Sequence, residues 1–361
     1  MAWPSISLIL NTLYLVLFAA FMIYGQKMQT SIALLGVRRK LKRLETFKDG
    51  AHSQLLHQIL PFCQDQTLVE GMLDRWENSF MIAPTNLDPA GLVRKLEHIL
   101  NTHDDGLKSD VRHLAATATD VQVDNLTDLL EVTIGLQSMF RVVRHYYLLS
   151  KKQGGPLALA QLQMNLPSIM EEAEAYNSAT EAFSSGKVVG DGIGPLVASR
   201  FADGTTAKEL VQDTNVYETT CQNRRLLVVR AKGPGGNVGK PGLAVEKLIR
   251  ENGSISRVIT VDAGLKLEGE ASGEVAEGTG AAIGGAGNER YHIEEAATKN
   301  DVALDAVIVK MSSKEAISTL TPELRKAADA AYDKVLYLIQ NETLPGDTVI
   351  VAGVGNTMGI D

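Results

Sequence analysis

Apolar residues fill the first part of the chain almost without interruption. From Ser5 to Tyr24 the sequence carries no charged residue, and Leu, Ile, Val, Phe, Ala and Met dominate it. A helix needs about 20 such residues to cross a bilayer, and no basic residue precedes Lys27, which argues against a cleaved signal peptide. The pattern predicts an uncleaved transmembrane helix within residues 1–26.

Basic residues follow this apolar segment with few acidic residues between them. They are Lys27, Arg38, Arg39, Lys40, Lys42, Arg43 and Lys48. The positive-inside rule then places everything downstream in the cytoplasm and the N-terminus outside. The same charges suit anionic lipid headgroups, although a retention charge without lipid specificity explains them equally well. We therefore expect a single-pass protein of the cell membrane with membrane lipid as a partner.

Three-four spacing of apolar residues continues through residues 27–183 and predicts a helical domain. Leu34, Val37, Leu41 and Leu44 form one short stripe of this kind. The stripe resembles a coiled-coil seam but is too short to establish a dimer. We expect a homodimer or a membrane-protein partner, if there is one, to use this helical region.

Beyond residue 184 the pattern changes to short β-branched runs separated by helical stretches. The runs are Leu226–Arg230, Arg257–Val261, Ala306–Lys310 and Thr348–Ala352. Nearly uninterrupted apolar strands are typical of a sheet that is buried on both faces, and strands that alternate with helices form parallel βαβ units. The predicted fold class is α + α/β, with an N-terminal transmembrane helix (1–26), a helical domain (27–183) and a three-layer α/β domain with a mainly parallel sheet (184–361).

Composition narrows the class of function. The 361 residues include 35 basic and 43 acidic residues, so the net charge is -8. This balance argues against a nucleic-acid interface spread over the whole surface. Cys63 and Cys221 are too few for a disulfide framework or a thiolate zinc site. We expect no nucleic acid among the partners.

A glycine-rich loop, GPGGNVGKPG at residues 233–242, follows the first of the predicted strands. Glycine backbone N–H groups and a helix N-terminus both favour anions, so the loop is a candidate phosphate or carboxylate cradle. A structural Gly/Pro turn explains the same pattern. The loop is not a Walker A motif, because Pro234 and Pro241 stand where that motif needs Gly and Ser or Thr. Together with the C-terminal GVGNTMGID, it supplies the candidate ligand-binding residues Gly235, Gly236, Asn237, Gly239, Lys240, Gly355 and Asn356.

The second predicted strand ends at Asp262 and leads into a long Gly/Ala-rich stretch that carries several glutamates. Connections of this length are often functional loops or lids, and a flexible acidic surface loop is the alternative. Glu268 and Glu270 are the candidate general bases for catalysis in this loop.

Two short motifs at opposite ends of the α/β region carry a family resemblance. Placed end to end, GVGNTMGID (353–361) and GDGIGPLVA (190–198) resemble the opening signature of the hydrogenase maturation peptidases, in which a strand leads into G-x-G-N and then into an acidic residue before G-x-G and a helix. VDAG (261–264), His292 and the helix at 320–339 keep that family's order. The split signature is the pattern of a circular permutant. We therefore expect residues 353–361 to pack beside residues 190–198.

The resemblance implies a metal site. In that family an acidic residue before G-x-G, an aspartate at the second strand end and a histidine grip a metal, and by position these are Asp191, Asp262 and His292 here. Such ligands suit Zn²⁺, Ni²⁺ or Mn²⁺. In the alternative interpretation, Asp191 caps a helix, Asp262 stabilises a turn and His292 is solvated.

The whole chain, including LDPAGLVRKLEHIL at residues 87–100, is similar to an archaeal family of membrane-anchored proteins of unknown function. That likeness supplies no activity. The first hypothesis is a metal-dependent, peptidase-like hydrolase on the cytoplasmic side of the membrane. The alternative is a non-catalytic binding module for an anionic small molecule that is coupled to a membrane partner, and a scaffold without a ligand is the third.

Overall fold

The structure is a computed structural model that describes residues 6–63, 65–85, 91–153 and 156–361. Its helical part consists of α1 (Ile6–Ile59), α2 (Gln66–Glu77), α3 (Leu92–Leu114), α4 (Asp120–Gln153) and α5 (Pro156–Ser185). The chain divides into two compact units, one formed by residues 1–50 and 136–173 and the other by residues 51–135 and 174–361.

The prediction of a transmembrane helix within residues 1–26 is wrong. Within the ranges that the structure describes, none of the helices combines the length and the apolar character that a membrane span requires. From Ile6 onward the apolar segment is the beginning of α1, a helix of 54 residues that runs on through the basic segment. Residues 1–5 lie outside the described residues. The single-pass topology and the cell-membrane location depended on this span and are corrected with it.

The first unit is built from parts of α1, α4 and α5. Val37 and Leu44 of α1 are buried, and so are Val143 of α4 and Leu166 of α5. Two residues of the predicted apolar stripe therefore lie in the interior of the chain's own fold.

The helical part of the second unit has a core of its own. The end of α1, α2, α3 and the first half of α4 supply it, with Leu55, Ile59, Val69, Leu73, Leu107, Val111, Leu126, Leu129 and Leu130 buried together. Asp65 caps the start of α2, where its carboxylate accepts a hydrogen bond from the Thr67 backbone N–H at 3.0 Å. Capping of this kind stabilises a helix terminus by about 1 kcal/mol.

The α/β part contains a seven-stranded sheet in the order β1-β2-β3-β7-β4-β6-β5. Its elements are η2 (Gly190–Gly192), α6 (Ile193–Ala202), β1 (Lys208–Val211), β2 (Thr214–Cys221), β3 (Arg224–Ala231), α7 (Pro241–Asn252), β4 (Ile255–Leu265), β5 (Val275–Thr279), α8 (Asn288–Asn300), β6 (Ala303–Met311), α9 (Ser313–Ile317), α10 (Pro322–Asn341) and β7 (Thr348–Gly353). The four predicted strands are β3, β7, β4 and β6, which pair in parallel at the centre.

The sheet is mixed, whereas the sequence predicted a mainly parallel sheet. This is the second correction to the predicted fold class, after that of the transmembrane helix. β1, β2 and β5 add three antiparallel pairings at the two edges. The sequence pattern missed these strands because a strand at or next to the edge of a sheet is partly solvated and needs no continuous apolar run. β5, for example, reads Val-Ala-Glu-Gly-Thr and is half-buried to exposed along its length.

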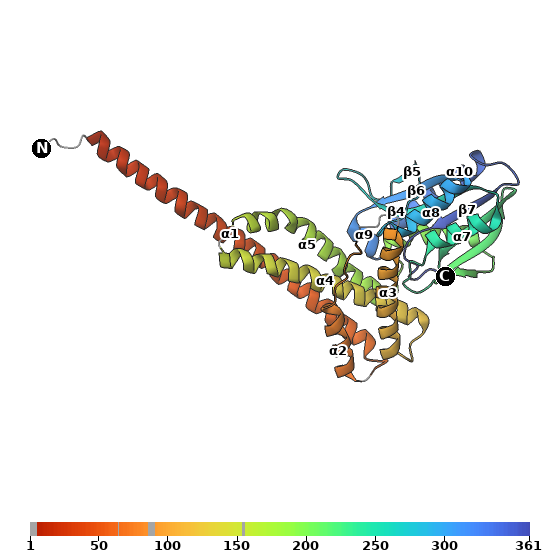
Figure 1. The fold of residues 1–361 in the computed structure, drawn as a ribbon, viewed down its shortest axis with the longest axis horizontal. Helices are drawn as coiled ribbons and strands as arrows, with labels where there is room; N and C mark the ends of the chain where they lie inside the picture. The colour runs from red at the N-terminus through yellow and green to blue at the C-terminus, as the bar shows by residue number, and fades with distance from the viewer. Residues whose placement is uncertain (1–5, 64, 86–90, 154–155) are drawn as a thin grey trace. The chain divides into compact units, whose positions relative to one another are not determined.

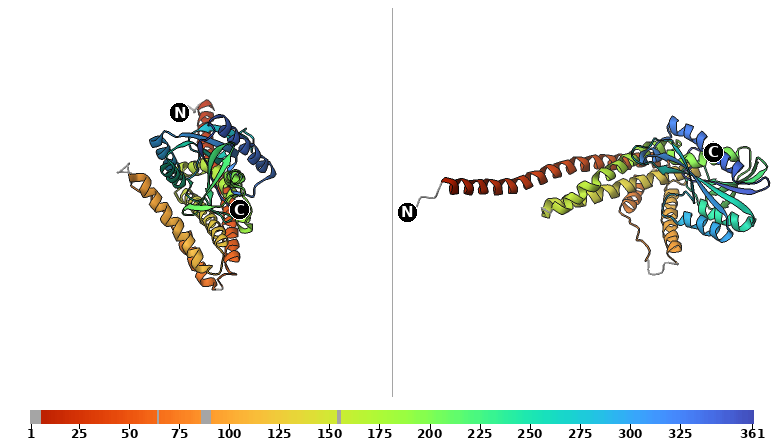
Figure 2. Two further views of the ribbon diagram at one scale, coloured as in Figure 1. Left: turned by 90° about the vertical axis from the view of Figure 1, so that its right-hand side faces the viewer. Right: turned by 90° about the horizontal axis from the view of Figure 1, so that it is seen from above.

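Helices cover both faces of the sheet, as the three-layer prediction required (Figures 1 and 2). α6 and α10 pack on one face, with Val197 and Leu324 in the core. α7 and α8 pack on the other face, with Val245 and Ile293 in the core. The connections from β3 to β4 and from β4 to β6 run in one direction along the sheet and contain α7 and α8. The connection from β6 to β7 runs in the opposite direction and contains α10. Because crossovers between parallel strands are right-handed, the two directions place their helices on opposite faces. The carboxyl ends of β3, β7 and β4 therefore meet at one edge.

Candidate functional site

The two ends of the α/β region meet at the carboxyl edge of the sheet. The Asn356 backbone N–H donates a hydrogen bond to Oδ2 of Asp191 at 2.8 Å. A Cβ atom at Gly194 would overlap the backbone oxygens of Val354 and Val261. Such close contact between backbones is open only to glycine. The predicted packing of residues 353–361 beside residues 190–198 is confirmed.

Asp191 and Asp262 line the same cavity, which has a volume of about 390 Å³ and lies outside the ends of β7 and β4. Asp262 is only 5% exposed. Its two carboxylate oxygens accept hydrogen bonds from the backbone N–H groups of Ala263 at 2.7 Å and Gly284 at 3.2 Å. Burial raises the pKa of Asp262 to about 8, and the nearby charge of Asp191 adds to the shift. Burial also raises the pKa of Asp191.

His292 does not join the two aspartates in lining this cavity. It lies in α8, where its Nδ1 is 2.7 Å from Oε2 of Glu246 in α7 and its Nε2 is 3.3 Å from Oε2 of Glu97 in α3. Its ring is therefore engaged in the helix layer and not at the strand ends.

The prediction of metal binding is wrong. Among the residues that the structure describes, no three His, Cys, Asp or Glu side chains lie where they could hold a metal ion together. The physical reason is that the third expected ligand lies elsewhere, because Glu246 of α7 and Glu97 of α3 engage the imidazole of His292.

The glycine-rich loop after β3 directs its backbone N–H groups at the protein itself. The Gly236 N–H donates to Oδ1 of Asn125 at 2.8 Å, and the Gly239 N–H donates to Oδ1 of Asn237 at 2.8 Å. The Lys240 N–H donates to Oγ1 of Thr214 at 2.6 Å, and the Gly242 N–H donates to Oε2 of Glu289 at 2.7 Å. N–H groups that already have protein acceptors are not free to hold an anion.

The glycines of this loop make room for carboxylates. A Cβ atom at Gly235 would lie 2.6 Å from Oδ2 of Asp124, and a Cβ atom at Gly236 would overlap Oδ2 of Asp128. Both aspartates belong to α4. Carboxylates of α4 therefore account for the glycines at positions 235 and 236 of the loop.

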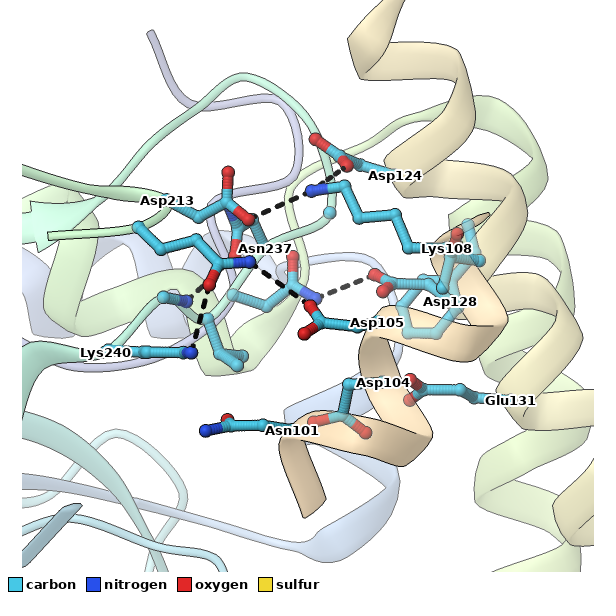
Figure 3. A pocket seen from close by; sticks show the side chains of 17 residues that line it. Asn101, Asp104, Asp105, Lys108, Asp124, Asp128, Glu131, Asp213, Asn237 and Lys240 are labelled. Carbon is cyan, nitrogen blue, oxygen red and sulfur yellow. Dashed lines mark hydrogen bonds and ion pairs between the residues drawn. The ribbon is translucent and has the colours of Figure 1, made fainter. Parts of the chain in front are cut away.

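A second cavity of about 230 Å³ lies between this loop and helices α3 and α4. Figure 3 shows the carboxylates of Asp104, Asp128 and Glu131 around it. The Asn356 side-chain N–H donates to Oδ2 of Asp128 at 2.8 Å. Asn356 thus connects this cavity to Asp191, which lines the first one.

Two lysines lie in the same cavity, and both already have partners (Figure 3). The ammonium group of Lys108 lies 2.9 Å from Asp124 and 3.0 Å from Asp213. Lys240 donates to Oε1 of Gln212 at 3.1 Å. Lys108 is therefore shared by two carboxylates, and its charge does not balance the remaining acids.

Burial is the main cause of the raised pKa values in this cluster, and neighbouring carboxylates add to it at Asp128. Burial raises the pKa of Asp128, and the charges of Asp124 and Asp191 raise it further, while the hydrogen bond from Asn356 opposes the shift. Burial likewise raises the pKa of Asp104. A carboxylate that is held near other carboxylates resists ionisation until a cation arrives.

The two cavities are neighbours and share Asn101, Asp104, Val238, Gly239 and Lys240. We call their combined lining the acidic recess. It contains nine carboxyl groups and two lysines; the carboxyl groups are those of Asp104, Asp105, Asp124, Asp128, Glu131, Asp191, Asp213, Asp262 and Glu289.

Family models match nearly the whole chain. The model for the N-terminal domain of a protein of unknown function, DUF1512, covers residues 11–186, and the model for the DUF1512 C-terminal domain covers residues 189–361. The chain belongs to the DUF1512 family. No protein with a curated description matches it.

Both DUF1512 domains supply the acidic recess. The N-terminal domain contributes the carboxylates of α3 and α4, and the C-terminal domain contributes the glycine-rich loop, Asp191, Asp262 and the segment after β7. Of the residues singled out from the sequence, Gly236, Asn237, Gly239, Lys240 and Asn356 line the smaller cavity. Gly355 lines the larger one. Gly235 lines neither cavity and packs against Asp124.

Glu268 and Glu270, the candidate general bases, lie in the connection between β4 and β5 and do not line the recess. Glu268 is exposed. Oε1 of Glu270 accepts a hydrogen bond from the Lys310 ammonium group at 2.5 Å, and Oε2 accepts one from the Leu267 backbone N–H at 2.7 Å. Both contacts hold this loop together.

Sequence reasoning missed the carboxylates of the DUF1512 N-terminal domain. Asp124, Asp128 and Glu131 stand at positions i, i+4 and i+7, which places them on one face of α4. That spacing was the available signal. Acidic rows on helices usually face water, and only the position of the glycine-rich loop opposite them distinguishes this row.

Proposed function

We propose that this chain is a binding module whose acidic recess takes a linear organic polyamine. The observation that carries the proposal is the recess itself: two joined cavities, each lined by carboxylates, with Lys108 paired internally. Each of the two cavities offers acceptors for an ammonium group, and charge-assisted hydrogen bonds are roughly twice as strong as neutral ones.

The same geometry favours a cation over the anionic ligand that the glycine-rich loop suggested. The N–H groups of Gly236, Gly239 and Lys240 have protein acceptors. An anion placed beside them would also face Asp104 and Asp128 at short range. Like charges in a partly desolvated site repel strongly.

An organic cation fits better than a metal ion. A metal needs several ligands that converge on one point at about 2.0 to 2.6 Å, and within the described residues no group of three ligating side chains does so. Ammonium groups spaced along a chain instead need acceptors that are spread out. The carboxylates of α4 and those at the sheet edge are distributed in this way.

Isothermal titration calorimetry on the full chain tests the proposal with spermidine, putrescine, butylamine and Mg²⁺. We expect spermidine to bind at least about ten-fold more tightly than butylamine, because it places charges in both cavities. Asp104→Asn removes a carboxylate that both cavities share and should weaken spermidine binding by about ten-fold. Asp333→Asn, an exposed change on α10, is the matched control.

The outcomes separate the alternatives. Tighter binding of Mg²⁺ than of spermidine would show a metal site instead. Equal binding of all amines, or an Asp104→Asn variant that binds as well as the Asp333→Asn control, would show nonspecific attraction to a negative surface. Either result contradicts the proposal.

We also infer that the C-terminal domain shares a permuted architecture with the hydrogenase maturation peptidases, without their activity. The contact between residues 353–361 and residues 190–198 supports this inference. A crystal structure of this chain superposed on such a peptidase tests it. We expect β7 and α6 to overlay the first strand and first helix of the peptidase, and a different overlay would contradict the inference.

A further inference from the structure

The imidazole of His292 lies between two glutamates from different helices. Nδ1 is 2.7 Å from Oε2 of Glu246 in α7, and Nε2 is 3.3 Å from Oε2 of Glu97 in α3. The side chains of His292 and Glu97 are only 14% and 16% exposed, while that of Glu246 is 37% exposed. This bridge connects the DUF1512 N-terminal domain to the C-terminal domain.

Both ring nitrogens face carboxylate oxygens, which defines the chemistry of the bridge. A neutral imidazole has one N–H and one lone pair, so it donates to only one of the two carboxylates. The imidazolium form donates to both, and each hydrogen bond is then charge-assisted. Glu289, from the same helix, adds a third negative charge that interacts with His292.

Glu97 stands on the part of α3 that leads to the recess. Asn101 and Asp104 follow it at i+4 and i+7, so the three side chains share one face of the helix. Both of these residues line both cavities of the recess. Further along α3, the ammonium group of Lys108 contacts Asp213 at 3.0 Å. Asn101 and Asp104 therefore lie between two attachments of α3 to the C-terminal domain.

We propose that His292 is a positioning residue for the acidic recess: by binding Glu97 it holds Asn101 and Asp104 of α3 opposite the glycine-rich loop. His292 does not line either cavity, so it acts through α3 and not on the ligand. The role in ligand binding rests on the proposed polyamine site, whereas the attachment of α3 does not.

Two measurements on the full chain test the proposal. The rate of hydrogen exchange in residues 92–104, measured without ligand, shows how firmly α3 is attached to the C-terminal domain. Titration with spermidine measures the affinity of the recess for the ligand. In His292→Ala we expect faster exchange of this segment and about ten-fold weaker spermidine binding. Glu97→Ala should have the same two effects, and the double variant should be no worse than His292→Ala alone, because both changes break the contact between His292 and Glu97.

Two further variants serve as the control and the rescue. His98→Ala removes the neighbouring, exposed histidine of α3 and should change neither measurement. His292→Arg supplies a side chain with several N–H donors and should restore spermidine affinity to within about three-fold of the wild type. A merely space-filling role would be restored better by His292→Leu than by His292→Arg.

Each outcome decides something different. If the wild type binds no spermidine while His292→Ala still frees α3, the proposed function fails and the attachment stands. If the wild type binds spermidine and His292→Ala binds it equally well, the positioning role is overturned. Unchanged exchange of residues 92–104 in His292→Ala overturns the attachment itself.

Discussion

Asp262 shows how burial controls a single carboxyl group at the sheet edge. Burial, together with the charge of Asp191, raises its pKa to about 8. An unfolded chain exposes the same group to water, where its pKa is about 3.9. The native state therefore holds a proton on Asp262 at pH values where the unfolded chain has released it.

This difference predicts how stability depends on pH. Between about pH 4 and pH 8 the native state binds more protons than the unfolded state, so the free energy of unfolding falls as pH rises, by up to about 1.4 kcal/mol per pH unit from this group. Asp262→Asn removes the titration, and its unfolding free energy should fall less steeply. Urea denaturation at several pH values measures this slope, with Asp333→Asn as the control. Equal slopes in Asp262→Asn and the wild type would contradict the prediction.

Gly194 tests the contact between the two ends of the α/β region. A Cβ atom there would overlap the backbone oxygens of Val354 and Val261, so Gly194→Ala should lower the free energy of unfolding by about 3 kcal/mol. Gly71→Ala is the matched control, since a Cβ atom at this helical glycine meets nothing within 4 Å. It should raise stability by up to about 1 kcal/mol. If urea denaturation shows the same effect for both variants, the contact is not as close as described.

At the scale of elements, Lys108 joins three parts of the fold. It extends from α3 to Asp124 in α4 and to Asp213 in the turn between β1 and β2. Its side chain is 35% exposed, so water screens both ion pairs. Lys108 thus stabilises the walls of the recess and at the same time reduces their negative charge.

These two roles predict effects of opposite sign for Lys108→Met. Loss of the ion pairs should lower the free energy of unfolding by about 1 kcal/mol. Loss of the positive charge should tighten spermidine binding by about three-fold, because the recess becomes more negative. Urea denaturation and calorimetry measure the two effects. Weaker spermidine binding by a folded variant would contradict the assigned charge of the recess.

At the scale of the whole molecule, the recess draws its walls from sequence positions that are far apart. A polyamine should therefore slow hydrogen exchange in segments of both DUF1512 domains, at residues 101–108 and 124–131 and also at residues 236–240 and 354–357. At 100 times the dissociation constant it should also raise the free energy of unfolding by about 2.7 kcal/mol. Exchange measured by mass spectrometry with and without spermidine tests this. Protection that is confined to one domain would contradict a shared site.

Local pattern predicted the central elements well. Four apolar runs became β3, β4, β6 and β7, because strands that are buried on both faces need apolar residues at every position. The edge strands escaped prediction, since exposure removes that requirement. At the N-terminus, apolar composition alone predicted a membrane span, and the described helices do not meet the requirements of one.

The candidate site was predictable only on one side. The glycine-rich loop and Asn356 were found from sequence because glycines and strand ends mark the edge of a sheet. His292 was assigned to the same edge by resemblance, and the packing of α8 against α3 and α7 places its ring between Glu97 and Glu246 instead. Ring orientation depends on neighbours that no local pattern reveals.

The sequence by itself determined the helical segments and the four central strands, because burial periodicity and turn residues are local properties. It also indicated that residues 353–361 and 190–198 belong together. Only the tertiary structure decided the sign of charge in the recess. In the sequence, Asp104 and Asp128 have the pattern of ordinary acidic residues on a helix surface. They line the recess because α3 and α4 pack against the glycine-rich loop. Charge acts through distance and exposure to water, and both are set by packing between residues far apart in the chain.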